Sequence, residues 1–425
     1  MQPQQFINLK YKPKGKDLIC LFNVEPNKLT IKQAAATVAL ESSVGTWTDV
    51  HEKKYVNKIA AKVFSIKGNK IKIAYPQELF EKGNAPNILS SIAGNIFGMK
   101  AVKNLRLEDI QIPNDILNSF KGPKYGIKGI RKMMKIKSRP LVGTIVKPKL
   151  GLKTKDHTDI AYQAWQGGCD VVKDDENLSS QKFNKFENRL TKCLEVADKA
   201  KSQTGEEKAY LINVTAETNK MIERAQSVQD QGGKYVMIDI VTSGFSALQT
   251  LRDANFKMAI HAHRAMHGAF TRNPKHGISM LVIAKLCRLI GMDQLHIGGI
   301  VGKMYEGKKE VTSVGEEIEQ QIVTESIFKH RLQEDWHDLK PMLAVCSGGL
   351  SPLTVRPLIH AMGRDIVIQA GGGVHGHPDG TVAGAKALRQ AVDAEMQGLL
   401  PSEYAKNHSE LALAMKKWGK HKKRA

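Results

Sequence analysis

Four consecutive residues, Lys173 to Glu176, place a lysine beside three carboxylates at the end of a short apolar run. Side chains two positions apart on a strand share a face, so Lys173 and Asp175 should point together, and Glu176 can turn back toward them. Two carboxylates suit Mg²⁺, which prefers oxygen ligands, but a lysine ammonium would repel that cation. The lysine is therefore either a counter-charge in a metal-free state or an amine altered into an oxygen ligand. A buried salt bridge without a metal is the structural alternative.

A second cationic group lies at the end of an earlier apolar run, where Lys147 and Lys149 flank Pro148. The two lysines should share a face. Like charges close to Lys173 would lower the pKa of the lysines from the usual value of about 10.4. A neutral amine can serve as a base, as an acid once protonated, or as a nucleophile. Binding of phosphate by the cations alone is the alternative.

Two histidines end later apolar runs. His263 is followed by Arg264, and His296 ends the next run. A single histidine is more often a hydrogen-bonded core residue, but two at equivalent strand ends point to a site. The last two runs end in Ser347-Gly348-Gly349 and Gly371-Gly372-Gly373, and glycines let backbone N–H groups approach an anion closely.

The elements that position these residues are short β-branched runs alternating with amphipathic helical segments from residue 140 onward. We expect strands at 141–149, 169–175, 209–215, 235–241, 258–264, 294–299, 341–349 and 365–373. Eight parallel strands with helical crossovers close naturally into a (β/α)8 barrel, here assigned to residues 121–425 with a basic C-terminal tail. An open doubly wound sheet is the alternative. In such barrels the reacting groups gather at the carboxyl ends of the strands, and the loops after strands seven and eight commonly bind phosphate.

Residues 1–120 follow a different pattern. A short strand at 71–76 and a helical segment at 30–43 predict a smaller α+β domain. Its boundary is expected in the Gly- and Lys-rich stretch after Pro113.

Composition narrows the class of protein. Lys and Arg number 64 and Asp and Glu 42, which gives 425 residues a formal charge of +22. No nucleic-acid-binding motif accompanies the basic segments 121–139 and 416–424, so a solvated basic surface is expected rather than a nucleic-acid partner. No apolar stretch reaches 18 residues and no secretory leader is recognisable, so no membrane span is expected. The five cysteines are far apart, which fits the reducing cytoplasm.

The carboxylates, lysines, histidines and glycine-rich loops at the ends of the predicted strands together indicate proton abstraction next to a carbonyl in a phosphorylated sugar, with a metal stabilising the enediolate.

At the same positions the chain resembles the large subunit of ribulose-1,5-bisphosphate carboxylase/oxygenase (RuBisCO), most closely its archaeal form III branch. The resemblance covers nearly the whole chain and lies in long motifs: GTIVKPKLGL, GGCDVVKDDEN, AIHAHRAMHGAFTRNPKHGISM, DQLHIGGIVGKM, SGGL, IQAGGGVHGHPDGT, ESSVGTWT and GNIFGMKAVKNLRLEDI. It implies a TIM barrel preceded by a ferredoxin-like domain.

By this resemblance an activating CO₂ converts Lys173 into a carbamate, whose oxygen joins Asp175 and Glu176 around one Mg²⁺. Lys147 would act as a general acid and base, His263 in a proton relay, and Lys303 on a mobile lid. The residues implied to bind substrate are Lys149, Arg264, His296, Lys303, Ser347, Gly348, Gly349, Gln369, Gly371 and Gly372. Glu41, Thr46, Trp47 and Asn95 would complete the active site of a neighbouring subunit.

The implied reaction is carboxylation of D-ribulose 1,5-bisphosphate by CO₂ to two 3-phosphoglycerates, with competing oxygenation by O₂. The implied assembly is a homodimer, or an assembly of homodimers, without a small subunit. Nucleotide salvage is the implied pathway. A RuBisCO-like enolase or isomerase acting on a related phosphosugar is the main alternative, and a non-catalytic barrel that binds anions or nucleic acid is another.

Overall fold

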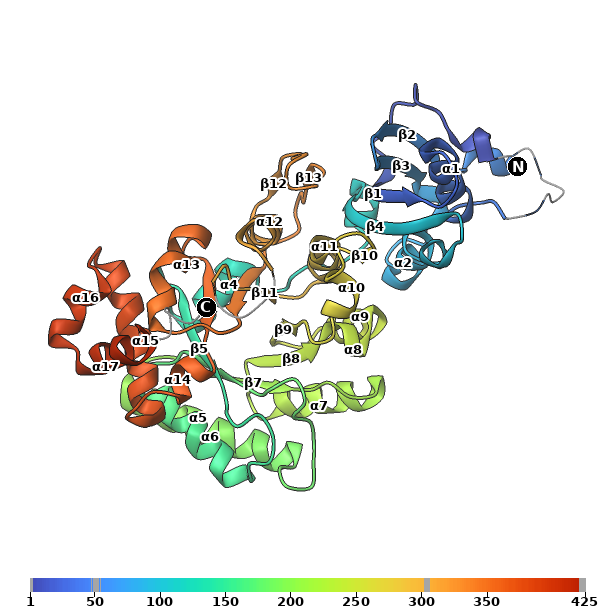
Figure 1. The fold of residues 1–425 in the computed structure, drawn as a ribbon. Coiled ribbons are helices and arrows are strands. Elements are labelled where there is room, and N and C mark those ends of the chain that lie inside the picture. Colours follow the sequence, from blue (N-terminus) through green and yellow to red (C-terminus); the bar gives the residue numbers. More distant parts are fainter. Residues whose placement is uncertain (1–2, 47, 49–52, 54, 302–305, 420–425) are drawn as a thin grey trace. The chain divides into compact units, whose positions relative to one another are not determined.

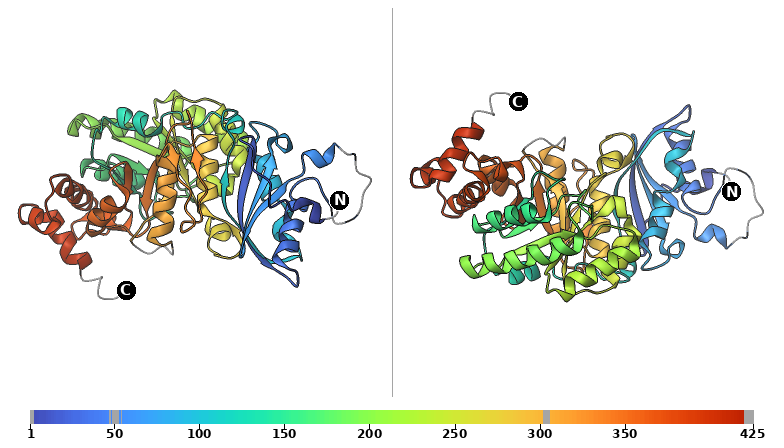
Figure 2. Two further views of the ribbon diagram at one scale, coloured as in Figure 1. Left: turned by 90° about the horizontal axis from the view of Figure 1, so that it is seen from above. Right: turned by 90° about the horizontal axis from the view of Figure 1, so that it is seen from below.

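The computed structural model describes residues 3–46, 48, 53, 55–301 and 306–419. The chain forms two compact units, coloured along the sequence in Figures 1 and 2. Unit 1 comprises Met1–Gly122, Met266–Gly291 and Gln320–Lys340, and unit 2 comprises Pro123–Ala265, Met292–Glu319 and Pro341–Ala425.

Unit 2 is a closed barrel of eight parallel strands, which confirms the predicted fold and excludes an open sheet. The strands are β5 (Leu141–Ile145), β6 (Val171–Lys173), β7 (Ala209–Asn213), β8 (Tyr235–Asp239), β9 (Ala259–His263), β11 (Gln294–Gly298), β14 (Leu343–Ser347) and β15 (Ile366–Gln369). They pair in the order β11-β14-β15-β5-β6-β7-β8-β9. Each lies inside a predicted strand but is shorter, because the polar residues that we expected to do chemistry belong to the strand tips and the loops beyond.

Helices cover the outside of the barrel, among them the long green α5 and α6 in Figures 1 and 2. The helices of unit 2 are α4 (Gly126–Met134), α5 (Thr154–Gln166), α6 (Phe186–Thr204), α7 (Thr218–Asp230), α8 (Ile240–Ser243), α9 (Phe245–Asp253), α12 (Lys308–Glu319), η5 (Pro352–Thr354), α13 (Val355–Met362), α14 (Gly372–His375), α15 (Gly380–Met396), α16 (Pro401–Tyr404), η6 (Ala405–Asn407) and α17 (Ser409–Gly419).

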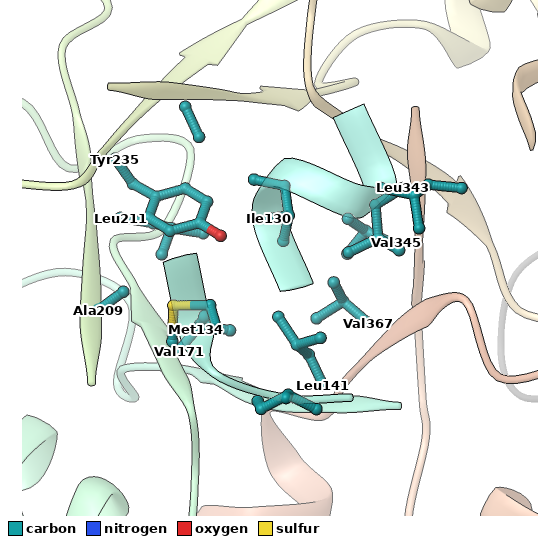
Figure 3. Packing of buried hydrophobic residues seen from close by; sticks show 13 residues of the cluster. Ile130, Met134, Leu141, Val171, Ala209, Leu211, Tyr235, Leu343, Val345 and Val367 are labelled. Carbon is teal, nitrogen blue, oxygen red and sulfur yellow. The ribbon is translucent and has the colours of Figure 1, made fainter. Parts of the chain in front are cut away.

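Helix α4 closes the amino-terminal end of the barrel. Its buried residues Ile127, Ile130 and Met134 recur at the spacing of one helical face. Figure 3 shows Ile130 between Leu343 and Val345 on one side and Leu211 and Tyr235 on the other. The barrel residues in this cluster are Leu141, Val171, Ala209, Leu211, Tyr235, Ala259, Leu343, Val345 and Val367. The floor of the barrel is therefore apolar and filled.

The start of α4 is fixed by the buried carboxylate of Asp293. It accepts hydrogen bonds from the backbone N–H groups of Tyr125 at 2.6 Å, Gly126 at 3.1 Å and Ile260 at 3.0 Å. A carboxylate at a helix N-terminus satisfies N–H groups that have no partner within the helix. Asp293 thus ties α4 to β9.

Unit 1 contains a five-stranded sheet in the order β10-β4-β1-β3-β2. Its strands are β1 (Asp17–Pro26), β2 (Lys62–Lys67), β3 (Lys70–Pro76), β4 (Val102–Gln111) and β10 (Gly277–Ile278), and a separate hairpin pairs β12 (Ile322–Val323) with β13 (Glu334–Asp335). The helices are η1 (Pro3–Phe6), α1 (Ile31–Glu41), η2 (Val56–Lys58), η3 (Gln77–Leu79), α2 (Ala85–Ile92), η4 (Asn95–Gly98), α3 (Asn114–Leu117), α10 (Gly268–Thr271) and α11 (Met280–Ile290). The succession β1-α1-β2-β3-α2-β4 with these pairings is the expected ferredoxin-like arrangement.

A buried ionic cluster explains why α11 groups with unit 1, although its sequence lies between two barrel strands. Every residue of α11 is buried. The Lys285 ammonium lies 3.0 Å from an Asp109 carboxylate oxygen and 3.4 Å from one of Glu334. A buried ammonium is stable only with such partners.

All five cysteines are buried free thiols. Among the described residues, no helix is long and apolar enough to span a bilayer.

Replacing Ile130 by alanine should destabilise unit 2. The side chain is fully buried at the centre of the barrel floor, and such truncations cost about 2–5 kcal/mol. Thermal and denaturant unfolding should show this loss, whereas Lys128→Ala, on the exposed face of the same helix, should shift stability by less than about 0.5 kcal/mol. Equal stability of the two variants would contradict the role given to α4.

Candidate active site

Lys173 ends β6 as a buried amine in a ring of acidic groups. Its Nζ lies 2.7 Å from the backbone oxygen of Asp174 and 3.2 Å from Met237 Sδ. Burial lowers the pKa of Lys173, although the charges of Asp175, Asp239 and Glu176 oppose the shift. We expected neighbouring lysines to lower this pKa. The cause is burial instead, and the carboxylates act against it.

Asp175 and Glu176 lie together with the two predicted lysines. Lys147 forms an ion pair with Asp175, and Lys149 Nζ lies 3.4 Å from Glu176 Oε1. Burial alone would raise the pKa of Asp175, but hydrogen bonds with Glu176 and Lys147 hold it well below its usual range. Burial and the neighbouring Asp175 raise the pKa of Glu176. The two carboxyl groups therefore lie close enough to shift each other's pKa in opposite directions.

Asp174 points to the other side of β6 and anchors the strand tip. Its carboxylate lies 3.1 Å from Arg189 Nη2 and 3.3 Å from His157 Nε2, and accepts a hydrogen bond from Tyr210. Burial would raise the pKa of Asp174, but Arg189 and His157 keep it well below its usual range. This anchor orients the backbone so that Lys173 and Asp175 face the barrel interior.

His263 at the end of β9 is paired with Asp239 at the end of β8, a residue that the sequence reasoning missed. His263 Nδ1 lies 2.8 Å from Asp239 Oδ1. Burial raises the pKa of Asp239 to about 7. Burial, with the charge of Lys173, lowers the pKa of His263 well below its usual value. The pair can hold and pass on a proton near neutral pH. Asp239 could have been noticed as the only acidic residue in its predicted strand.

Arg264, which follows His263 in the sequence, lies against Gly298 of β11. Its Nη2 is 2.8 Å from Glu306 Oε1, and both side chains are buried. Any Cβ at Gly298 would lie 2.8 Å from the same Nη2, and Gly298 has a φ of +96° that favours glycine. Gly298 therefore leaves room for the guanidinium.

His296, on β11, contacts side chains of the two neighbouring strands, β14 and β9. Its Nδ1 lies 2.8 Å from Ser347 Oγ, and its Nε2 lies 2.8 Å from His261 Nε2. The structure thus brings together two residues expected to bind substrate, His296 and Ser347. It also adds His261, which belongs to the sequence motif of His263 and Arg264 and had been given no role.

The ends of β5 and β15 meet beside Lys147. A Cβ at Gly371 would lie 3.2 Å from Lys147 Cε. Gln369 is buried, and its Nε2 lies 3.4 Å from the Thr144 backbone oxygen. Gly372 begins α14. After β14, Gly348 and Gly349 have φ values of +106° and +79°, so glycine is favoured at both positions.

The residues expected to serve a neighbouring subunit lie in unit 1. Glu41 ends α1, Thr46 follows it, and Asn95 is exposed at the start of η4. Trp47 and Lys303 lie outside the described residues. The roles assigned to all these side chains stay predictions.

The donor set fits Mg²⁺ only if Lys173 is modified. Among the described residues, no group of three His, Cys, Asp or Glu side chains is placed to hold a metal ion. Asp175 and Glu176 supply two carboxylates, and a third oxygen ligand would come from a carbamate on Lys173. Burial lowers the pKa of this amine and so favours its neutral form, the form that a reaction with CO₂ would need.

Comparison with known proteins identifies the family. The model of the ribulose bisphosphate carboxylase large chain catalytic domain matches residues 126–418, and that of its N-terminal domain matches residues 5–116. The chain is 49% identical to the ribulose bisphosphate carboxylase of Methanosarcina mazei, over 98% of this chain and 99% of that protein. It is 50% identical to that of Methanocaldococcus jannaschii, over 97% and 99%.

Two solved structures have the same fold. The dimeric archaeal Rubisco from Hyperthermus butylicus superposes with a TM-score of 0.93 at 44% identity, covering 98% of this chain and 99% of that one. The octameric Rubisco from Pyrococcus horikoshii, crystallised with sulfate, gives a TM-score of 0.91 at 46% identity, covering 99% and 97%.

His375 should make the stability of the protein depend on pH. Its Nε2 lies 2.9 Å from the Ile145 backbone oxygen, and burial lowers its pKa to about 4, against about 6.5 in an unfolded chain. The His375 side chain therefore stays neutral in the native state, whereas the same side chain gains a proton in the unfolded state. The free energy of unfolding accordingly decreases as the pH falls from 6.5 to 4.

The difference in melting temperature between the wild type and His375→Gln should narrow over this pH range. Thr381→Val removes a 3.1 Å hydrogen-bond partner of His375 but no titrating group, so it should keep the wild-type pH dependence. A difference that stays constant from pH 7 to pH 4 would show that His375 is not held neutral.

Proposed function

The chain belongs to the ribulose bisphosphate carboxylase large-chain family, and from that premise we propose that it joins CO₂ to D-ribulose 1,5-bisphosphate to give two molecules of 3-phosphoglycerate. The observation that carries the proposal is the buried amine of Lys173 beside Asp175 and Glu176, with Lys147 paired to Asp175. Competing oxygenation by O₂ belongs to the same proposal.

Activation begins at Lys173. The neutral amine attacks the carbon of an activating CO₂: an N–C bond forms as one C=O π pair moves onto oxygen, and the nitrogen releases its proton to the solvent. The resulting carbamate carries a negative charge. It would therefore offer Mg²⁺ a third oxygen ligand beside Asp175 and Glu176, where an ammonium would repel the cation. Mg²⁺ bound there would polarise the substrate carbonyl and stabilise the enediolate.

Residues of the barrel then handle protons. Lys173, in its carbamate form, takes the C3 proton of the sugar. Lys147 lies within hydrogen-bond reach of Asp175 and serves as general acid and base, finally protonating the new carbanion. His263, with Asp239 behind it at 2.8 Å, relays a proton during hydration. Asp239 is thus a positioning residue for His263.

The remaining residues bind the substrate. Arg264 holds one phosphate, with His296 beside it in contact with Ser347, and Lys149 and Ser347 contact the sugar. Around the other phosphate we place Lys303, Gly349, Gly371 and Gly372, with Thr46 and Trp47 from the neighbouring subunit. Lys303 also steadies the new carboxylate and excludes water.

Because Glu41, Thr46, Trp47 and Asn95 are assigned to the neighbouring active site, the working unit is a homodimer or an assembly of homodimers. Dimeric and octameric archaeal relatives support this assembly. A small subunit forms no part of the proposal, and we place the enzyme in the cytoplasm and its reaction in nucleotide salvage.

The first test is a carboxylation assay. Purified protein with Mg²⁺, ribulose 1,5-bisphosphate and labelled bicarbonate should place the label in 3-phosphoglycerate. Accumulation of a phosphorylated enol or isomer without label would overturn the proposal in favour of an enolase or isomerase.

Lys173→Arg should abolish carboxylation, because a guanidinium does not form a carbamate and keeps its positive charge. Initial rates and trapping of the activating CO₂ should both fall to background. Lys155→Arg, on the exposed surface of α5, is the matched control and should retain both. Wild-type turnover in Lys173→Arg would refute the assignment of this lysine.

A further inference from the structure

A column of hydrogen-bonding side chains runs through the barrel from its apolar floor to its mouth. Tyr235 belongs to the floor cluster. The Gln294 side-chain nitrogen lies 3.5 Å from the Tyr235 hydroxyl, and Gln294 Oε1 lies 2.8 Å from His261 Nδ1. From His261 the contacts continue to His296 and Ser347, each at 2.8 Å.

We propose that Gln294 and His261 are positioning residues that fix the tautomer of His296 and, through it, make the Ser347 hydroxyl a hydrogen-bond acceptor toward the substrate. The part of this inference that concerns the substrate rests on the proposed function. The direction of the hydrogen bonds does not, because it follows from the placement of the Gln294 amide oxygen against His261 Nδ1.

Each imidazole in the column carries one N–H and one lone pair. His261 and His296 are buried, and burial lowers the pKa of both well below the usual value. Two neutral imidazoles joined through their Nε2 atoms share a single proton between them. Once one end of the column is fixed, every other hydrogen bond must follow the same direction.

Gln294 fixes that end. Its Oε1 can only accept, so His261 carries its proton on Nδ1 and donates it to Gln294. His261 Nε2 is then a lone pair and accepts the Nε2–H of His296. His296 Nδ1 is left as an acceptor, and the Ser347 hydroxyl donates to it.

This direction has a chemical consequence at the barrel mouth. A hydroxyl that donates its single hydrogen to His296 has only lone pairs left for a ligand. Ser347 therefore selects a donor, such as a sugar hydroxyl, and disfavours a carbonyl or phosphate oxygen at the same place. The buried column holds this preference because reversing one hydrogen bond requires reversing all of them.

The test reads the tautomers directly. Protein labelled with ¹⁵N in histidine should show His261 protonated on Nδ1 and His296 on Nε2, with the signals assigned by their loss in His261→Asn and His296→Asn. Neutron diffraction from deuterated crystals of the wild type is an independent measurement that needs no variant. Protonation of His296 on Nδ1 by either method would overturn the inference.

Two further variants separate control of direction from simple packing. Gln294→Met keeps a similar volume but removes the acceptor, so both histidines should lose their single tautomer and kcat/KM should fall about tenfold, the effect of one hydrogen bond. Ser347→Ala removes the far end of the column and should leave both tautomers unchanged. His360→Gln replaces an exposed histidine outside the column. As the control it should leave both tautomers and kcat/KM unchanged.

The opposite pattern, with tautomers lost in Ser347→Ala and kept in Gln294→Met, would show that the column is not directed from Gln294. Because the spectra require no turnover, a wild-type protein that lacked carboxylase activity would contradict the proposed function alone and leave this assignment standing.

Discussion

The site depends on one constraint, the burial of an amine within a ring of carboxylates. Lys173 is buried at the tip of β6, and its ammonium is disfavoured by desolvation more strongly than Asp175, Asp239 and Glu176 favour it. An environment rich in negative charge would ordinarily keep a lysine protonated. Here the low polarity of the surroundings outweighs that charge and lowers the pKa of Lys173, which supports the proposed reaction of this amine with CO₂.

The barrel creates this environment by changing polarity along each strand. Residues two apart share a face, so each strand presents an interior series from floor to mouth. Val171 leads to Lys173 on β6, and Leu343 leads through Val345 to Ser347 on β14. The lower members pack on α4 in a dry cluster, which excludes water beneath the site. The upper members are polar, and they find partners on neighbouring strands because these strands are parallel and in register.

The same periodicity explains how much could be predicted. All eight strands follow from short apolar runs, and the grouping of Lys147, Asp175 and Glu176 follows from charged residues at the ends of two of these runs, which is a local pattern. Asp239 and Gln294 were missed because their importance lies in partners on other strands, 24 and 33 residues away. The grouping of α11 with unit 1 escaped prediction for a similar reason, since it depends on Asp109 and Glu334. The domain boundary that we placed between residues 120 and 121 stays a prediction.

Hydrogen-bond direction is a further level of organisation that residue types alone do not define. His296 with Ser347 could present either a donor or an acceptor to a ligand. The sequence motifs that contain these two residues are identical for both directions, so they do not reveal which one occurs. The choice is made at Gln294, the first residue of β11 and away from the barrel mouth. A side chain buried in the middle of a barrel can in this way set the chemistry of its rim without touching the substrate. Substitutions among buried polar residues of a barrel can therefore alter recognition while every contact residue stays the same.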